Sequence, residues 1–146
     1  MQTWLVGDGR VDATCVHRGV SGCTLLLIAA EHGHTQLVEV VLKHGAEADA
    51  RDGGDSTALM AAALSGYEQV AEMLLRHGAR INLQDRKHGV TALMAAAANG
   101  HERVAEMLLR HGAGINLQNS LGGTALRPPS ATVPAWCFAC CGRAQT

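Results

Sequence analysis

A stretch of 28 residues occurs twice in this chain, at 57–84 and at 91–118, and the two copies are identical at 23 positions. A weaker copy begins at Thr24 and a fourth opens at Thr124, so the opening threonines are spaced by 33, 34 and 33 residues. A repeat period of this length indicates a stack of small structural units. Because one such unit cannot bury its apolar face alone, the stack must form as a whole.

Each unit predicts two short helices followed by an extended connection. Thr57 is suited to cap the first helix, because its hydroxyl can accept a hydrogen bond from a free N–H group of the first turn. Helix-forming Leu, Met and Ala residues follow, and Gly66 ends the helix. The second helix carries apolar residues at helical spacing, including Leu74 and Leu75, and Gly78 ends it. The residues between Gly78 and the next threonine predict a hairpin connection.

These units resemble the ankyrin repeat family. Its signature, Thr-Pro-Leu-His-x-Ala-Ala, appears as TALMAAA at 57–63, again from Thr91, and in a looser form from Thr24. Alanine stands where the family has proline, and leucine or methionine stands where it has a histidine whose ring bonds between units. The resemblance covers about residues 20–126. It implies an all-α solenoid in which helix-turn-helix units are joined by β-hairpin loops.

The repeat boundaries divide the chain into five segments. Two prolines follow Arg127, where a fourth first helix would continue, and each costs roughly 3 kcal/mol in a helix interior. The connection between Asp12 and Thr24 is longer than the later ones and is predicted to be mobile. The segments are the remnant of a preceding repeat with its loop (1–23), repeat 1 (24–56), repeat 2 (57–90), repeat 3 (91–123), and a truncated fourth repeat with a tail predicted to be disordered (124–146).

Composition and motifs exclude several classes of function. A net charge of −1 does not predict a basic face for nucleic acid, and no run of 18 apolar residues predicts a membrane span. No secretory signal is evident, and an odd count of five cysteines favours a reducing compartment, so we expect a cytoplasmic or nuclear protein. No Ser-His-Asp set, phosphate-binding loop or carboxylate pair emerges. We therefore expect no enzymatic activity and no cofactor.

Two groups of possible metal ligands have simpler interpretations. His44, His77 and His111 occupy one equivalent position near the end of each second helix, where an imidazolium interacts favourably with the helix dipole. Because stacking places them a repeat apart, they form a row and no metal site is predicted. The tail holds a Cys-x-x-Cys-Cys cluster, whose spacing also allows zinc binding or acylation, next to two aromatic residues that could cover the face of repeat 3. The tail residues are Trp136, Cys137, Phe138, Cys140 and Cys141.

The resemblance implies a surface for partner binding. In ankyrin proteins the hairpin tips and the exposed positions of the first helices line a concave groove. Two of these positions differ between the otherwise near-identical copies, and Lys87 lies where the connection holds an extra residue, as a recognition surface would show. The alternative is that these positions are unconstrained solvent positions. Carried over by position, the candidates are Arg51, Ser56, Leu64, Ser65, Gln84, Arg86, Lys87, His88, Val90, Ala98 and Asn99, with Gly53, Glu31 and His32 at related places.

The predicted function is that of a protein-protein interaction module, a scaffold or adaptor. The basic tip formed by Arg86, Lys87 and His88 favours an acidic segment of a protein partner. One alternative is a fragment or truncated isoform of a larger ankyrin protein whose other domains carry enzymatic or regulatory activity. Another is a small metal-binding protein that uses the tail cysteines. The resemblance also raises hydroxylation of Asn82 and Asn116, because the family's hairpin asparagines can be modified.

Overall fold

The computed structural model describes residues 14–17 and 19–125, so the predictions for residues 1–13 and for the tail from 126 lie outside the described residues. The described residues form one two-stranded hairpin and six helices. In chain order these are β1 (Thr14–His17), β2 (Val20–Thr24), α1 (Leu25–His32), α2 (Thr35–Lys43), α3 (Ala58–Ser65), α4 (Glu68–Arg76), α5 (Ala92–Ala98) and α6 (Glu102–Arg110).

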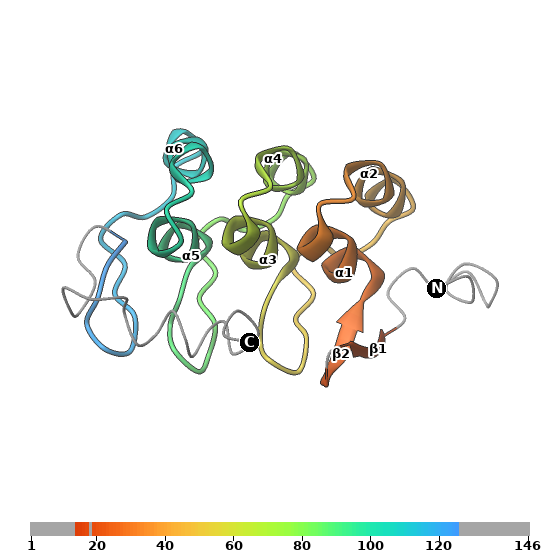
Figure 1. The fold of residues 1–146 in the computed structure, drawn as a ribbon, viewed down its shortest axis with the longest axis horizontal. Coiled ribbons are helices and arrows are strands. Elements are labelled where there is room, and N and C mark those ends of the chain that lie inside the picture. The colour runs from red at the N-terminus through yellow and green to blue at the C-terminus, as the bar shows by residue number, and fades with distance from the viewer. Residues whose placement is uncertain (1–13, 18, 126–146) are drawn as a thin grey trace.

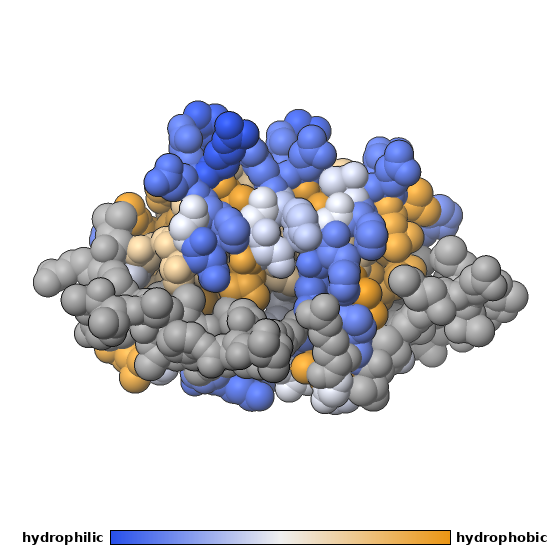
Figure 2. Space-filling model, in the orientation of Figure 1, coloured by the Kyte–Doolittle hydropathy of each residue, from blue (hydrophilic) through white to orange (hydrophobic). Residues whose placement is uncertain are grey.

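The helices stack in two layers. The first helices of the units, α1, α3 and α5, pack side by side in one layer, and the second helices, α2, α4 and α6, form the other (Figure 1). The connections project from the layer of first helices, on the side away from α2, α4 and α6 (Figure 1). Hydrophilic residues gather over these second helices, with hydrophobic patches below them (Figure 2). The predicted all-α repeat stack is confirmed.

The first helices of the units, α1, α3 and α5, begin where the threonines predict. The side-chain oxygens of Thr24, Thr57 and Thr91 accept hydrogen bonds of 3.2–3.3 Å from the backbone N–H group three residues later. Gly66 ends α3 in the left-handed conformation, with φ 83°, and Gly78 takes φ 90° just after α4. Each cap satisfies backbone groups that the helix itself leaves unpaired.

The core is built from small and branched apolar residues. Several alanines on the first helices are 0% exposed, which lets adjacent units approach closely; they are Ala29, Ala30, Ala62, Ala63 and Ala96. Leu74 and Leu108, on equivalent positions of α4 and α6, are both 0% exposed. Leu75 of the same apolar stripe is only half-buried and packs against this core. A residue one position along a helix is rotated by about 100° and faces a different direction.

Only the first connection contains regular strands among the described residues. Strands β1 and β2 pair antiparallel with Thr14 opposite Thr24, Cys15 opposite Cys23 and His17 opposite Val20, with an irregularity between Cys15 and His17. Two strands thus form where a loop was predicted, because the longer connection has enough residues to satisfy its backbone groups across two strands. The mobility of this connection stays a prediction. The later connections follow a hairpin path, but each is closed by only two internal backbone hydrogen bonds, as between Asp85 and Val90 and between Gly89 and Asp85.

We call the four connections fingers 1 to 4. Finger 1 comprises residues 14–24, finger 2 residues 49–57, finger 3 residues 82–91 and finger 4 residues 116–124.

Candidate functional site

Fingers 2, 3 and 4 each fold around one buried polar side chain. Asp52, Asp85 and Asn119 occupy the equivalent position at the base of each finger and are 4–6% exposed. In finger 3, Asp85 Oδ1 accepts from the backbone N–H groups of His88 at 3.1 Å and Val90 at 2.7 Å. The Oδ1 atoms of Asp52 and Asn119 each accept two backbone N–H groups in the same way, at 2.8–3.0 Å.

These three residues were not among the predicted sites. The signal that could have found them is an Asp or Asn five or six residues before Thr57, Thr91 and Thr124, because Asp and Asn side chains readily bond the backbone a few residues ahead. Their hydrogen bonds replace the cross-strand ladder that a regular hairpin would have. The fingers therefore hold a defined shape without being strands.

Neighbouring fingers are also bonded to one another near their tips. The Gly53 amide donates to the Ser21 carbonyl oxygen at 2.6 Å, which joins finger 2 to finger 1. The Arg86 amide donates to the Asp55 carboxylate, which joins finger 3 to finger 2. The Ser120 amide donates to the His88 carbonyl oxygen at 2.8 Å, which joins finger 4 to finger 3. The four fingers thus form one connected row.

Two residues that were predicted to bind a partner instead form hydrogen bonds within this row of fingers. Arg51 Nη1 donates to Asp55 Oδ2 at 2.7 Å and to the Gln84 carbonyl oxygen in the next finger at 3.1 Å. Gln84 Nε2 donates to the Gln118 carbonyl oxygen in the following finger at 2.9 Å, and to Gly89 within its own finger at 2.8 Å. Their polar groups bind neighbouring backbone, so we assign Arg51 and Gln84 to holding the fingers in register.

Val90 was predicted to face a partner, and this prediction is wrong. Its side chain is 0% exposed and belongs to the hydrophobic core. Val90 directly precedes the helix-capping Thr91, and its backbone is bonded twice to Asp85. The finger therefore ends with this side chain turned inward, while the equivalent Ser56 is half-buried.

The remaining candidates differ in how accessible they are. Leu64 and Ala98 are half-buried and pack against the core. Ser65 and Asn99, at the ends of the neighbouring helices α3 and α5, are exposed. Asn99 Nδ2 donates to the Ala95 carbonyl oxygen at 2.8 Å, and Asn99 forms the end of α5.

The tip of finger 3 is basic. Arg86 and Lys87 are exposed, whereas His88 is half-buried with its Nδ1 3.1 Å from Asp85 Oδ2. Arg86 Nε lies 3.8 Å from Asp55 Oδ1, a long contact for a side chain that is 81% exposed. Within the part of the chain that the structure describes, Lys87 makes no ion pair.

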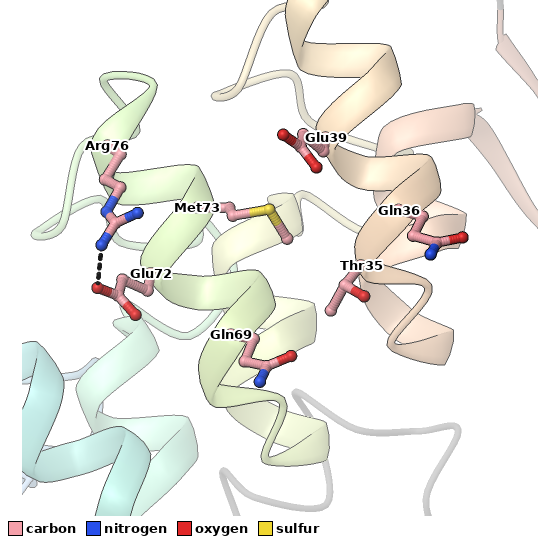
Figure 3. Close-up of a pocket in the computed structure, with 7 residues that line it drawn as sticks. All are labelled: Thr35, Gln36, Glu39, Gln69, Glu72, Met73 and Arg76. Carbon is pink, nitrogen blue, oxygen red and sulfur yellow. Dashed lines mark hydrogen bonds and ion pairs between the residues drawn. The ribbon is translucent and has the colours of Figure 1, made fainter.

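The outer helices carry a different surface. A groove of about 260 Å³ lies between α2 and α4, and Met73 extends across it toward α2 (Figure 3). Its charged residues pair along their own helices, Glu72 with Arg76 at 2.8 Å and Glu39 with Lys43 at 2.8 Å. The hydrogen bond and the charge of Lys43 hold the pKa of Glu39 below its usual value. The groove is open to solvent and its charges are already paired, which does not favour catalysis.

The histidines fall into separate places. His44, His77 and His111 follow the last residues of α2, α4 and α6, so each lies at the end of a different helix. The structure instead brings together His17, Glu31 and His32, a group that sequence reasoning did not connect. The tail residues Trp136, Cys137, Phe138, Cys140 and Cys141 lie outside the described residues.

Comparisons with known proteins agree with this architecture. A family model described as "Ankyrin repeats (3 copies)" matches residues 2–85, and a model described as "Ankyrin repeat" matches residues 88–120. A search of curated proteins found no match. None of the helices in the described residues is long and apolar enough to cross a membrane.

Proposed function

The chain belongs to the ankyrin repeat family, whose repeats generally bind other proteins and are typically non-catalytic, and from this membership we propose that it is a scaffold or adaptor without chemistry of its own. Its partner-binding surface would comprise the tip of finger 3 and the exposed ends of the first helices. The residues are Ser65, Arg86, Lys87 and Asn99, with His88, Leu64 and Ala98 at the margins and Ser56 on finger 2.

The connected row of fingers is the observation that supports this proposal most. Each of fingers 2, 3 and 4 folds around a buried acceptor, and each finger is bonded to the next. A partner that docks on such a row orders little of the protein, so less conformational entropy is lost on binding. Rigid presentation by the stack is therefore the mechanism.

The chemistry of the tip favours an acidic partner segment. Arg86 and Lys87 are adjacent and exposed, and Asp55, the carboxylate 3.8 Å from Arg86 Nε, already accepts from Arg51. Positive side chains at the rim of an interface attract an acidic segment and speed its association. Asn99 and Ser65 add exposed hydrogen-bonding groups, which suit the backbone or polar side chains of a bound peptide.

A charge-reversal comparison tests this surface. The full chain, the double variant Arg86→Glu/Lys87→Glu and the control Lys43→Glu/Arg103→Glu would be used in parallel affinity purifications with quantitative mass spectrometry. Both doubles change net charge equally, but the control residues lie on the outer helices α2 and α6. We expect at least one directly binding protein to be lost with the finger variant and retained with the control. Equal loss with both doubles, or no loss with either, contradicts the proposed surface.

Acidic and basic synthetic peptides distinguish charge complementarity from other recognition. Fluorescently labelled peptides of matched length, one Glu-rich and one Lys-rich, would be titrated with the full chain. We expect the acidic peptide to bind more tightly, with an affinity that falls as salt is raised. A preference for the basic peptide contradicts the acidic-partner proposal.

A further inference from the structure

Three side chains from two distant parts of the sequence converge at the start of the stack. His17 ends strand β1, and Glu31 and His32 are the last two residues of α1. One potential metal-ligand atom from each of these residues lies within 4.8 Å of the other two. The β1–β2 hairpin lies below α1 in Figure 1, so the end of β1 comes close to the end of α1.

His17 contributes a buried nitrogen to this cluster. Its Nε2 atom is buried, has no hydrogen-bond partner among the described residues, and lies 3.6 Å from Glu31 Oε2. A buried polar atom without a hydrogen bond is costly, so an occupied site would relieve that cost. Two ligand atoms on a tetrahedral zinc ion lie about 3.3 Å apart, given metal-ligand bonds of about 2.0–2.1 Å. The observed separation is close to this value.

His32 is held in an orientation that suits metal binding. Its Nδ1 lies 2.9 Å from the Ile28 carbonyl oxygen, which can only accept, so this contact favours the neutral tautomer with the proton on Nδ1 and the lone pair on Nε2. Ligating histidines commonly donate their second ring N–H to a backbone carbonyl in this way. The His32 ring lies edge-on to that of His17, with centroids 5.5 Å apart, and His32 is exposed, which provides a route for an ion.

We propose that His17, Glu31 and His32 bind one divalent transition-metal ion, with Zn²⁺ as the expected occupant. Two imidazoles and one carboxylate are a ligand set that zinc uses with a water or a fourth side chain completing the tetrahedron. The His34 ring stacks on that of His32, with centroids 6.0 Å apart, and is a candidate for the fourth ligand. The ion would clamp finger 1 to the end of α1 and so stabilise the N-terminal end of the stack.

The competing account is an ion pair between a protonated His17 and Glu31, which needs no metal. The two accounts differ in what happens when zinc is added. If only an ion pair forms, added zinc should neither bind nor change the melting temperature. A metal site predicts stoichiometric zinc binding and a higher melting temperature, because an ion that binds only the folded state stabilises it.

Zinc titration tests the proposal in a chain whose tail thiols cannot contribute. Full-length protein carrying Cys137→Ser, Cys140→Ser and Cys141→Ser would be titrated with Zn²⁺ in competition with a chromogenic chelator. We expect one ion per chain. Each of His17→Ala, Glu31→Gln and His32→Ala should weaken its affinity at least about tenfold. The matched controls His44→Ala and His111→Ala should leave the affinity unchanged.

Two further measurements keep the test decisive. Circular dichroism of the metal-free variants checks folding, and if a histidine variant unfolds, the near-isosteric Glu31→Gln variant decides the result. With Co²⁺ in place of Zn²⁺, we expect visible absorption without the intense near-ultraviolet band of thiolate ligation. Absence of Zn²⁺ binding, binding that survives Glu31→Gln, or a thiolate band each overturns the proposal.

Discussion

The imidazole Nε2 of His101 lies 2.9 Å from the carbonyl oxygen of Leu64 and bonds it across the boundary between two repeats. His101 precedes α6, while Leu64 lies in the last turn of α3. The repeats lack the family's inter-unit histidine in their first helices, and this ring provides a bond between units from another position. The same ring packs against Gly66, where an added Cβ atom would come within 2.6 Å of it.

The bond from His101 should contribute measurably to stability. We expect His101→Ala to lower the free energy of unfolding by about 1–2 kcal/mol, because it removes one hydrogen bond and the packing of a half-buried ring. Urea denaturation followed by circular dichroism measures this change. His111→Ala, at an exposed helix end, is the control and should change stability by less than about 0.5 kcal/mol. Equal effects of the two variants would contradict the role given to His101.

Replacing Gly66, which follows α3, should destabilise the protein more than replacing Gly78, which follows α4. Gly66→Ala places a Cβ atom against the His101 ring at a positive φ, whereas Gly78→Ala has the same kind of backbone but nothing within 4 Å of its Cβ. We expect about 1–2 kcal/mol of destabilisation from backbone strain alone at Gly78, and more at Gly66. Thermal denaturation compares them. When His101→Ala is already present, adding Gly66→Ala should destabilise the protein no more than Gly78→Ala does. If Gly66→Ala still costs more than Gly78→Ala in that background, the clash with the His101 ring is not the cause.

Adjacent leucines on α4 should differ in their contribution to the core. Leu74 is fully buried and Leu75 is half-buried, so we expect Leu74→Ala to cost about 2–5 kcal/mol and Leu75→Ala clearly less. Chemical denaturation of both variants and the wild type measures the difference. If Leu75→Ala proved as costly as Leu74→Ala, the orientation of α4 in the stack would be incorrect.

Asp85, the buried hydrogen-bond acceptor of finger 3, should tolerate replacement by Asn but not by Ala. Asp85→Ala leaves the backbone N–H groups of His88 and Val90 without their acceptor, and we expect a loss of about 1–3 kcal/mol. Asp85→Asn should cost less, since Asn119 performs the same task in finger 4. Hydrogen exchange of the finger 3 amides reports the local effect. Unchanged exchange at Val90 in Asp85→Ala is the contrary result.

Replacing either of two arginines in the fingers should have different effects on stability, because Arg51 has a structural role and Arg86 is proposed to bind a partner. Arg51 is 22% exposed and bonds both Asp55 and the neighbouring finger, so Arg51→Ala should destabilise by about 1–2 kcal/mol. The Arg86 side chain is largely exposed, and Arg86→Ala should change stability by less than about 0.5 kcal/mol. Melting temperatures of the two variants at low and high salt provide the test. A larger loss from Arg86→Ala would reverse the roles assigned here.

Much of the fold is predictable because it depends on local interactions that recur with the repeat. A threonine at a helix start, a glycine after a helix and an apolar stripe each act within about one helical turn, and the repeat applies the same choice three times. Thr57, Gly66 and Leu74 are therefore assigned correctly from the sequence.

The errors lie in the fingers, where the outcome depends on neighbours a whole repeat away. The exposure of Val90 is set by how finger 3 closes around Asp85, and the roles of Arg51 and Gln84 by bonds to the following finger. These residues occupy the predicted positions in the sequence. The position of a residue within its unit, however, does not reveal whether its polar group forms a hydrogen bond with an adjacent unit.

The amino-acid sequence by itself determined the repeat, its helix boundaries and the apolar face that forces the units to stack. Only the tertiary structure decided which finger residues face solvent and which bond the next finger, and only it brought His17 to Glu31 and His32. The physical reason is that helices form from contacts between residues three or four apart, whereas these relationships require separate segments to be placed against each other in three dimensions.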